Sequence, residues 1–385
     1  MREVAITGIG QTSVSEHWDL SLKELAGKAV LSAIEDSRVS GIEGIFIGNM
    51  MSGMLSKQEN LGALITDWVG MGSIEAMKVE AACGSGAAAF RAGLMAVGSG
   101  MMDSAVVVGV EKMTENLPVE TTSALATASD ADYEAAQGIT FIALNALVMR
   151  RYLHEYGWSH KDFAFFSINA HANAMHNPNA RFQEQITSED YSRARMVADP
   201  INLLDASPIG DGAAAVVIVP ADHIRVIGGP KIVVAGSASA TDSLAVHDRT
   251  DPLWLTAAER SARKAYHQAG VEPKDIDIFE LHDAFSIMSA LSLEACGFAE
   301  RGQAPRLALD GEITPQGRIP ITTRGGLKAR GHPVGATGMY QIVEVVQQLR
   351  GEAEGTQVDG AKIGMAQNIG GSGATIITTI LRSEF

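Results

Sequence analysis

The sequence predicts a layered α/β fold built from two similar halves, with an extra segment inserted into the first half. Short apolar stretches at 106–110, 214–219 and 376–380 are typical of strands, and Ala-rich or amphipathic stretches lie between such strands. Strands that alternate with helices in this way indicate a parallel or mixed sheet covered by helices. A second observation, an internal repeat, organises the chain.

The repeat consists of matching segments that occur in the same order in both halves. Its most informative pair is Cys83-Gly-Ser-Gly-Ala87 and His332-Pro-Val-Gly-Ala336, at an offset of 249 residues. Near the end of each copy, 209–218 matches 369–378 at an offset of 160. Three earlier pairs are 4–8 with 233–236, 28–33 with 264–269, and 45–46 with 278–279. We expect the central helices of the two copies to pack together in a layered sandwich.

The fall in offset from 249 to 160 indicates an insertion of roughly 90 residues in the first copy. We predict that 116–199 form a loop or cap domain over the functional site. The first half then comprises 1–115 and 200–225, and the second half comprises 226–385.

The composition excludes several classes of protein. Hydrophobic residues make up 46% of the 385 residues and charged residues 19%, which is enough to bury a large core. The net charge of −15 argues against nucleic acid and anionic membranes as partners. The two cysteines have no CxxC or zinc-ligand spacing, so we expect neither a disulfide framework nor a metal. No signal peptide pattern and no apolar run near ~18 residues occur, which predicts a soluble cytoplasmic protein.

Cys83 is the candidate nucleophile. It lies in Glu80-Ala-Ala-Cys-Gly-Ser-Gly-Ala-Ala-Ala-Phe90, between a strand-like stretch and an Ala-rich helix. The N–H groups and positive dipole of a helix N-terminus lower the pKa of a thiol, so we expect a thiolate here. The small neighbours let a substrate carbonyl approach, with its oxyanion bound by the Cys83 N–H. Taken alone, an inert buried cysteine is the more common case.

His332 favours the catalytic interpretation because it occupies the position equivalent to Cys83. It also opens a predicted helix, with Pro333 at the first helical position. If the copies pack about a pseudo-twofold axis, thiol and imidazole meet near that axis, as an activated nucleophile requires. His282 follows a short strand, where it is placed to stabilise an enolate. Asp283 either orients His282 or is a helix cap.

The glycine run Gln367-Asn-Ile-Gly-Gly-Ser-Gly373 follows another predicted strand. Its N–H groups are placed to complete a second oxyanion hole beside Cys83. The run is a poor match to dinucleotide binding, because no acidic residue follows at the required distance. Cys296, in an apolar helix-like stretch, is expected to pack in the core.

These motifs together make the chain resemble the thiolase superfamily over essentially its whole length. The Cys83 element, His282-Asp-Ala-Phe285, Gly331-His-Pro-Val-Gly-Ala-Thr-Gly338 and Asn368-Ile-Gly-Gly-Ser-Gly373 occur in the family's order. The resemblance is closest to sterol-carrier-protein-type and archaeal thiolases, which carry an HDxF block. It implies a five-layered αβαβα sandwich made from two βαβαβαββ halves, and a homodimer or homotetramer. It also implies CoA thioesters as substrates, with CoA itself as a substrate and no permanently bound cofactor.

The resemblance further implies a role for each site residue. Cys83 is the acylated nucleophile, and His332 is its activating base. His282 belongs to the oxyanion hole for the thioester enolate. The N–H groups of Cys83 and Gly370 form the hole for the acyl carbonyl.

The chain departs from the family where relatives carry a second, acid/base cysteine. Asn368 and Ala284 stand at the two positions where such a cysteine occurs. The site is therefore a Cys-His-His set, which elongating ketoacyl synthases also use. Proton transfer at the substrate α-carbon then falls to His282 or His332.

The function expected from these residues is acyl transfer by a thiolase, through cleavage of a 3-ketoacyl-CoA or the reverse Claisen condensation. Arg324, Lys328 and Arg330 either meet the CoA phosphates or form a solvated loop. The alternatives are a decarboxylating condensing enzyme, and a thiolase-like lipid-binding, CoA-binding or aldolase subunit. A small zinc-ribbon/OB-fold protein is a possible partner. The acyl chain and the direction of the reaction stay open.

Overall fold

The computed structural model describes residues 2–224 and 231–384, and its main feature is a nine-stranded sheet. The strands follow the order β3-β2-β4-β7-β1-β8-β11-β10-β9. The predicted boundary at 225/226 lies outside the described residues. The strands of this sheet are β1 (Val4–Gln11), β2 (Gly44–Gly48), β3 (Glu75–Val79), β4 (Ala105–Glu111), β7 (Gly212–Pro220), β8 (Lys231–Thr241), β9 (Ile278–Glu280), β10 (Ile363–Gly370) and β11 (Thr375–Glu384).

The strand order is mirrored about the junction between β1 and β8. Moving outward from that junction, β7 corresponds to β11, β4 to β10 and β2 to β9. The junction itself consists of the antiparallel pairs Ala5↔Val233 and Ile6↔Ile232. The predicted internal repeat is therefore confirmed as two structurally equivalent halves that share one sheet.

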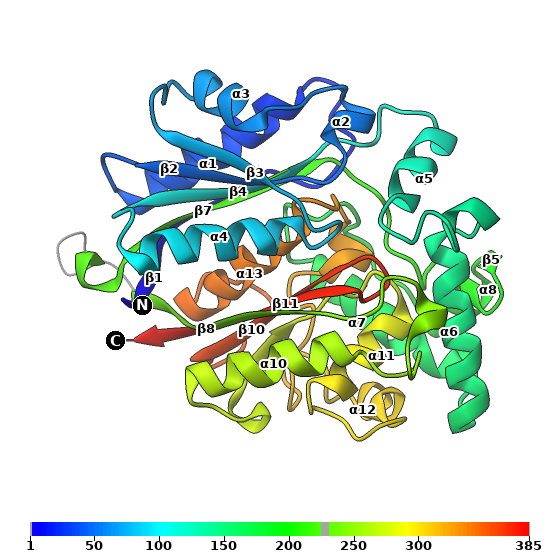
Figure 1. Ribbon diagram of the computed structural model, residues 1–385. Helices are drawn as coiled ribbons and strands as arrows, with labels where there is room; N and C mark the ends of the chain where they lie inside the picture. The colour runs from blue at the N-terminus through cyan, green and yellow to red at the C-terminus, as the bar shows by residue number, and fades with distance from the viewer. Residues whose placement is uncertain (1, 225–230, 385) are drawn as a thin grey trace.

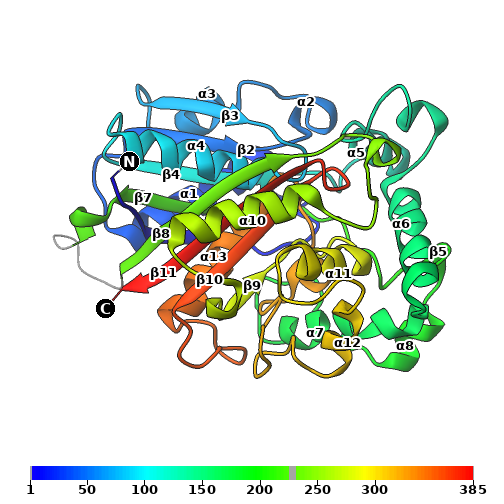
Figure 2. The same ribbon diagram turned by 60° about the horizontal axis from the view of Figure 1, so that its bottom comes forward.

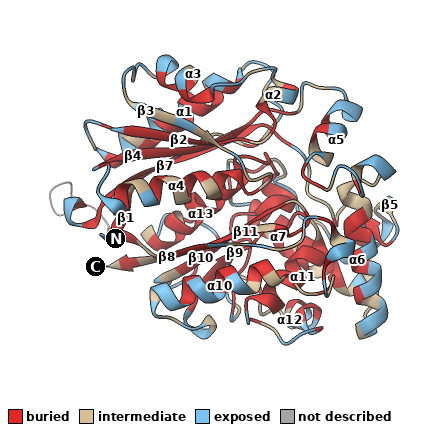
Figure 3. Cartoon of the chain, viewed as in Figure 1, coloured by how far each residue is buried: buried red, intermediate tan, exposed pale blue. Residues whose placement is uncertain are grey.

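The helices complete five layers, which Figures 1 and 2 show from two directions. Helices α1 (Leu22–Ser37) and α3 (Leu61–Trp68) cover the outer face of the first half. Helices α10 (Thr256–Ala269) and α11 (Ser286–Ala295) cover the outer face of the second half, while α4 (Ser85–Ser99) and α13 (Thr337–Arg350) lie between the halves. Figure 3 shows α13 as buried along its length. The predicted αβαβα sandwich is confirmed.

The two middle helices approach each other closely because both begin with glycines. A Cβ added at Gly86 in α4 would lie 2.9 Å from the Gly335 carbonyl oxygen. A Cβ added at Gly338 in α13 would lie 2.5 Å from the Ala87 nitrogen. The Gly-Ser-Gly and Gly-Ala-Thr-Gly sequences therefore set the distance between the helix N-termini.

The segment 116–199 forms its own group of helices at one end of the sandwich (Figure 1). Its one strand, β5 (Met196–Ala198), pairs with β6 (Ile201–Asn202) and not with the main sheet. Its helices are α5 (Pro118–Ala126), α6 (Phe141–Tyr156), α7 (Ala164–Ala174) and α8 (Ser188–Arg193). Helix α7 packs on a π-helical turn, η6 (Gly326–Arg330), through Ala170, Ala174 and Ala329.

The remaining elements are short. They are α2 (Ser52–Leu55), α12 (Ala304–Leu309), η1 (Ala135–Gln137), η2 (His160–Phe163), η3 (Ala221–His223), η4 (Val246–Asp248) and η5 (Pro273–Asp275). Across residues 2–224 and 231–384, no helix combines the length and the apolar character needed to cross a bilayer.

The close approach of α4 and α13 leads to a stability prediction. Gly338→Ala is expected to lower the free energy of unfolding by about 1–3 kcal/mol, since the added methyl group must displace its neighbours. Gly72→Ala is the matched control, because a Cβ there meets nothing within 4 Å. Urea unfolding of the two variants measures the difference. Equal stability would contradict the tight contact between the helices.

Candidate active site

Three side chains that are far apart in the sequence line one cavity of about 150 Å³: Cys83, His282 and His332. Cys83 precedes α4, His282 follows β9, and His332 lies between η6 and α13. The rest of the wall is mostly apolar and includes Leu125, Phe141, Ile142, Ala284, Phe285, Met288, Val334 and Ile369. The structure thus brings together the three residues that the sequence singled out.

A tight turn positions Cys83 immediately before α4. Ala82 has a φ of 52°, an uncommon conformation for a residue with a side chain. The Ser85 hydroxyl stabilises the turn, since it accepts from the Ala81 N–H at 3.0 Å and donates to the Ala82 carbonyl at 2.6 Å. The turn holds the cysteine at the helix entrance with its side chain in the cavity wall.

Cys83 is a protonated thiol in the free enzyme, so the expected thiolate is wrong. Burial raises the pKa of Cys83 to about 12, and the nearby Glu111 carboxyl adds to this effect. The N–H groups of Cys83 and Gly371 act in the opposite direction. The favourable helix N-terminus is therefore outweighed by the loss of water and by a buried acidic group.

Glu111, at the end of β4, is a site residue that the sequence reasoning missed. Its carboxyl group accepts from four donors: Asn49 Nδ2 at 2.9 Å, Met50 N at 3.0 Å, Met51 N at 3.2 Å and Gly335 N at 3.1 Å. It therefore fastens the loop after His332 to the first half of the sheet. Burial raises the pKa of Glu111 to about 7. In the sequence, the one feature that could have identified Glu111 is that it is a single acidic residue at the end of an apolar strand.

His332 has a defined tautomer. Its Nδ1 lies 2.7 Å from Thr337 Oγ1, and that hydroxyl donates its hydrogen to the Pro333 carbonyl at 3.1 Å. With the hydroxyl hydrogen on the Pro333 carbonyl, Nδ1 is assigned as the donor to Thr337, and the Nε2 lone pair is left free as a base. Burial, together with the charge of Arg330, lowers the pKa of His332 to about 3. Helix α13 begins at Thr337, so the prediction that Pro333 is its first residue was wrong.

His282 has the opposite tautomer. Asn368 Nδ2 lies 3.1 Å from His282 Nδ1 and donates to it, so the hydrogen of the imidazole is on Nε2. The two imidazole rings are edge to face with centroids 5.1 Å apart. Burial lowers the pKa of His282 well below its usual value, and His332 and Arg330 add to the shift. The site thus contains one imidazole acceptor and one imidazole donor, both neutral.

Asp283 is a helix cap, which is the second of its two predicted roles. Its carboxylate accepts from the backbone N–H groups of Leu327 at 2.6 Å and Lys328 at 3.3 Å. It therefore caps the π-helical turn η6 and does not orient His282 or cap α11, which begins after Phe285. A Cβ at Gly326 would lie 2.6 Å from this carboxylate, which explains the glycine there.

The glycine run places Gly371, and not Gly370, in the cavity wall. The Gly371 N–H interacts with the Cys83 sulfur, while Gly370 is buried behind it at the end of β10. A Cβ at Gly370 would lie 2.3 Å from the Ala81 carbonyl oxygen. The geometry therefore favours the N–H groups of Cys83 and Gly371 as the pair that faces an acyl oxygen.

The expected contact of Arg324, Lys328 and Arg330 with CoA phosphates was wrong. Their exposed fractions are 4%, 2% and 0%, and their charged groups are used inside the protein. Lys328 Nζ donates to the Asp205 carbonyl, and Arg330 pairs with Glu344. They are neither a solvated loop nor an exposed basic patch. Cys296 is 2% exposed and accepts from Gln367 Nε2 at 3.1 Å, as a core residue.

The raised pKa of Cys83 predicts how the thiol reacts with a small alkylating reagent. The thiolate fraction grows tenfold per pH unit below the pKa, so alkylation by iodoacetamide should rise steadily from pH 7 to pH 9. Intact-mass kinetics measures the rate, with Cys83→Ala as the control for background reaction at Cys296. A plateau near neutral pH would reveal a preformed thiolate and contradict this protonation state.

Comparisons with known proteins agree with this arrangement. The N-terminal domain model of thiolases matches residues 3–222, and the thiolase C-terminal domain-like model matches 238–383. An acetyl-CoA acetyltransferase from Methanothermobacter thermautotrophicus is 47% identical over 97% of this chain and 98% of that protein. The benzoylsuccinyl-CoA thiolase subunit BbsB of Thauera aromatica is 32% identical over 93% of this chain and 92% of that protein.

Solved structures give the same result. The structure described as an Ltp2-ChsH2(DUF35) aldolase superposes with a TM-score of 0.86 at 26% identity, covering 99% of this chain and 98% of that chain. The paired halves, the shared cavity and these full-length matches lead to one conclusion. The chain belongs to the thiolase family of acyltransferases.

Proposed function

We propose that the protein transfers an acyl group between CoA thioesters through an acyl-Cys83 intermediate. The observation that carries this proposal is the pair of opposite histidine tautomers beside one cysteine. His332 presents a free Nε2 lone pair, and His282 presents an Nε2–H. A base and an oxyanion donor are the two functions that thioester exchange and carbon–carbon bond formation require.

In the first half-reaction, His332 removes the proton of the Cys83 thiol as the sulfur attacks the thioester carbonyl. The N–H groups of Cys83 and Gly371 stabilise the developing oxyanion. The tetrahedral intermediate then expels the CoA thiolate, which takes the proton back from His332. The products are acyl-Cys83 and free CoA, and His332 is neutral again.

In the second half-reaction, His332 removes an α-proton from a second acyl-CoA. His282 donates its Nε2–H to the oxygen of the resulting enolate. The enolate carbon attacks the acyl-Cys83 carbonyl, and the Cys83 thiolate leaves and regains the proton from His332. The product is a 3-ketoacyl-CoA. Cleavage by CoA follows the same steps in reverse.

The size of the cavity supports a short acyl group. A volume of about 150 Å³, closed by Phe141, Phe285 and Met288, accommodates a few carbon atoms next to the sulfur. The relative from Methanothermobacter thermautotrophicus is named an acetyl-CoA acetyltransferase. We therefore propose acetyl-CoA and acetoacetyl-CoA as the substrate pair.

An aldolase is the second candidate, because the similar solved structure is described as one. An aldolase of this fold would need no acyl-enzyme, whereas here the cysteine, a base and two facing N–H groups are all present. Detection of an acyl adduct on Cys83 separates the two functions. A decarboxylating condensing enzyme would instead form its product from malonyl-CoA.

Replacing each histidine with alanine should impair a different step of the reaction. His332→Ala should slow acetylation of Cys83 by acetyl-CoA about 10²–10⁴-fold, since the base is lost. His282→Ala should still form the acetyl adduct but lower turnover about 10²–10³-fold, since the enolate loses its donor. Intact mass follows the adduct, and acetoacetyl-CoA cleavage follows turnover. Full turnover by Cys83→Ala would overturn the acyl-enzyme mechanism.

A larger cavity on the other side of α6 is the better candidate for the anionic part of CoA. Its volume is about 360 Å³, and Arg151 and Arg249 contribute cationic groups to its wall. Leu144 lines this cavity, and the neighbouring Asn145 lines the catalytic one. We propose that CoA lies along this turn of α6.

Arg151 provides a test of that binding mode. Its side chain is 59% exposed and forms an i,i+4 pair with Glu155. Arg151→Ala should raise the KM for CoA about three- to tenfold with little change in kcat, because a phosphate contact is lost. The matched control is Arg193→Ala, which removes another exposed i,i+4 pair with Glu189. Equal KM values in both variants would exclude this site.

We also propose that the chain forms a homo-oligomer. Strand β3 lies at the edge of the sheet, has Met77 46% exposed, and leads directly to the Cys83 turn. An exposed edge strand next to the site is suited to pair with a second copy. Light scattering of Met77→Lys tests this contact.

A small zinc-ribbon/OB-fold protein is the proposed partner of another kind. The similar solved structure, described as an Ltp2-ChsH2(DUF35) aldolase, combines a chain of this fold with a DUF35 protein and supports such a partner here. Co-purification tests it. Two free thiols fit a reducing compartment such as the cytoplasm, which we propose as the location.

A further inference from the structure

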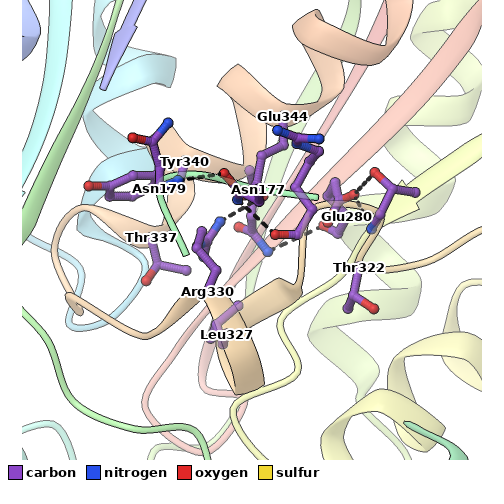
Figure 4. Close-up of polar contacts among 12 residues, drawn as sticks. Asn177, Asn179, Glu280, Thr322, Leu327, Arg330, Thr337, Tyr340 and Glu344 are labelled. Atoms are coloured by element: carbon purple, nitrogen blue, oxygen red, sulfur yellow. Dashed lines mark hydrogen bonds and ion pairs between the residues drawn. The ribbon is translucent and has the colours of Figure 1, made fainter. Parts of the chain in front are cut away.

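A group of charged side chains lies behind the two histidines, inside the protein. Glu280, Arg324, Arg330 and Glu344 have exposed fractions of 4% or less, and we call them the buried charge cluster. Figure 4 shows how Glu280, Arg330 and Glu344 converge from three different elements. The catalytic cavity is lined by other residues, so the cluster does not touch the substrate.

The centre of the cluster is the ion pair between Arg330 and Glu344. Nη1 of Arg330 lies 2.7 Å from Oε2 of Glu344, and both side chains have 0% exposure. The guanidinium also lies over the ring of Tyr340, 4.9 Å from its centroid. Because Tyr340 and Glu344 are one turn apart on α13, Arg330 clamps the end of η6 onto that helix.

Two members of the cluster lie close to the histidines in the sequence, because Arg330 and Glu280 each precede a histidine by two residues. Gly331, with a φ of 106°, separates Arg330 from His332 and lets the two side chains point in different directions. In the other segment, Leu281 lies between Glu280 and His282. Thr323 fixes Glu280 by donating from its backbone N–H at 2.8 Å and from its hydroxyl at 2.6 Å.

A side chain of α13 also reaches the second segment. Gln341 Nε2 donates to the Glu280 carbonyl at 3.2 Å and to the Gln367 carbonyl at 2.9 Å. Helix α13 therefore contacts both histidine-bearing segments, one through Arg330 and the other through Glu280. A shift of α13 would therefore move both segments, and loss of the ion pair would release η6 from that helix.

We propose that the buried Arg330–Glu344 ion pair is a positioning device: it fixes η6 on α13 and so sets the place of His332, while Gln341 of the same helix fixes the segment that carries His282. The proposal rests on the proposed function, since it concerns the same Cys83 chemistry. Arg330 is a positioning residue, because it acts through the histidines.

The charge of the cluster supports this role. Arg330 Nε and Nη2, Glu344 Oε1 and Glu280 Oε2 have no hydrogen-bond partner among the described residues. Burial raises the pKa of Glu280 to about 8, which keeps it mostly protonated at neutral pH and leaves the cluster positive. After burial itself, the charge of Arg330 is a cause of the lowered pKa of His332 and of His282. The titratable and charged groups around His332 are Cys83, Glu111, His282 and Arg330.

The deciding variant is the double substitution Arg330→Met with Glu344→Leu. Replacing both partners of a buried ion pair with apolar side chains avoids an uncompensated charge, so the fold is expected to survive. Acylation by acetyl-CoA is measured by rapid-quench intact mass from pH 5 to pH 8. In the wild type His332 stays neutral down to pH 5, so the change in rate across this range should follow Glu111, whose pKa is about 7. In the double variant the rate at pH 8 should fall at least tenfold. The acid limb of the pH profile should also move to higher pH, because the pKa of His332 is no longer lowered by the charge of Arg330.

Two further variants separate positioning from stability. Arg350→Met removes a second arginine of α13, which pairs with Asp36 at 2.7 Å far from the site. It should lower the melting temperature without changing the acylation rate or its pH profile. Arg330→Lys keeps the positive charge but removes the planar guanidinium group. It should keep the wild-type pH profile and lose about three- to tenfold in rate.

The experiment separates a failure of the positioning role from a failure of the proposed acyl-transfer function. A wild type that forms no adduct on Cys83 would overturn the proposed function. A wild type that acylates, together with a folded double variant of unchanged rate and pH profile, would overturn the positioning role alone. If the double variant does not fold, Arg330→Lys decides, because a wild-type rate in that variant would also overturn it.

Discussion

The structure depends on the contact between the N-termini of α4 and α13. Each helix follows a loop that carries one reactive side chain, Cys83 or His332, and the glycines at both helix starts allow the backbones to touch. The pseudo-twofold order of the sheet places these helices side by side between the two halves. A larger residue at Gly86 or Gly338 would move the helices apart and separate the thiol from its base. The reactive pair is therefore a consequence of how two similar halves pack.

Once this contact is made, burial sets the pKa values of the groups in the site. The site excludes water, so the thiol, both imidazoles and Glu111 are each shifted toward their neutral forms. A neutral resting state has a physical advantage for acyl transfer. Charge appears only when the thioester arrives, and the N–H groups that stabilise it are already in place.

The residue that replaces the second cysteine of other family members has a definite structural effect. Asn368 donates to His282 Nδ1 and so keeps the hydrogen of this imidazole on Nε2, facing the cavity. A cysteine would supply an acid/base group, whereas the asparagine supplies an orienting hydrogen bond. This arrangement supports our proposal that His332 removes the proton at the substrate α-carbon.

The sequence by itself determined the two-copy α/β architecture, and it predicted the inserted segment and the three candidate site residues. Their signals are local: strand and helix periodicity, matched offsets, and short motifs around Cys83, His282 and His332. Only the tertiary structure decided the protonation states and the partners of the polar residues. Glu111 accepts from Gly335, Asp283 caps η6, and Arg330 lies buried against Glu344. These contacts and the loss of water depend on segments that fold together from distant parts of the chain, so no local pattern could specify them.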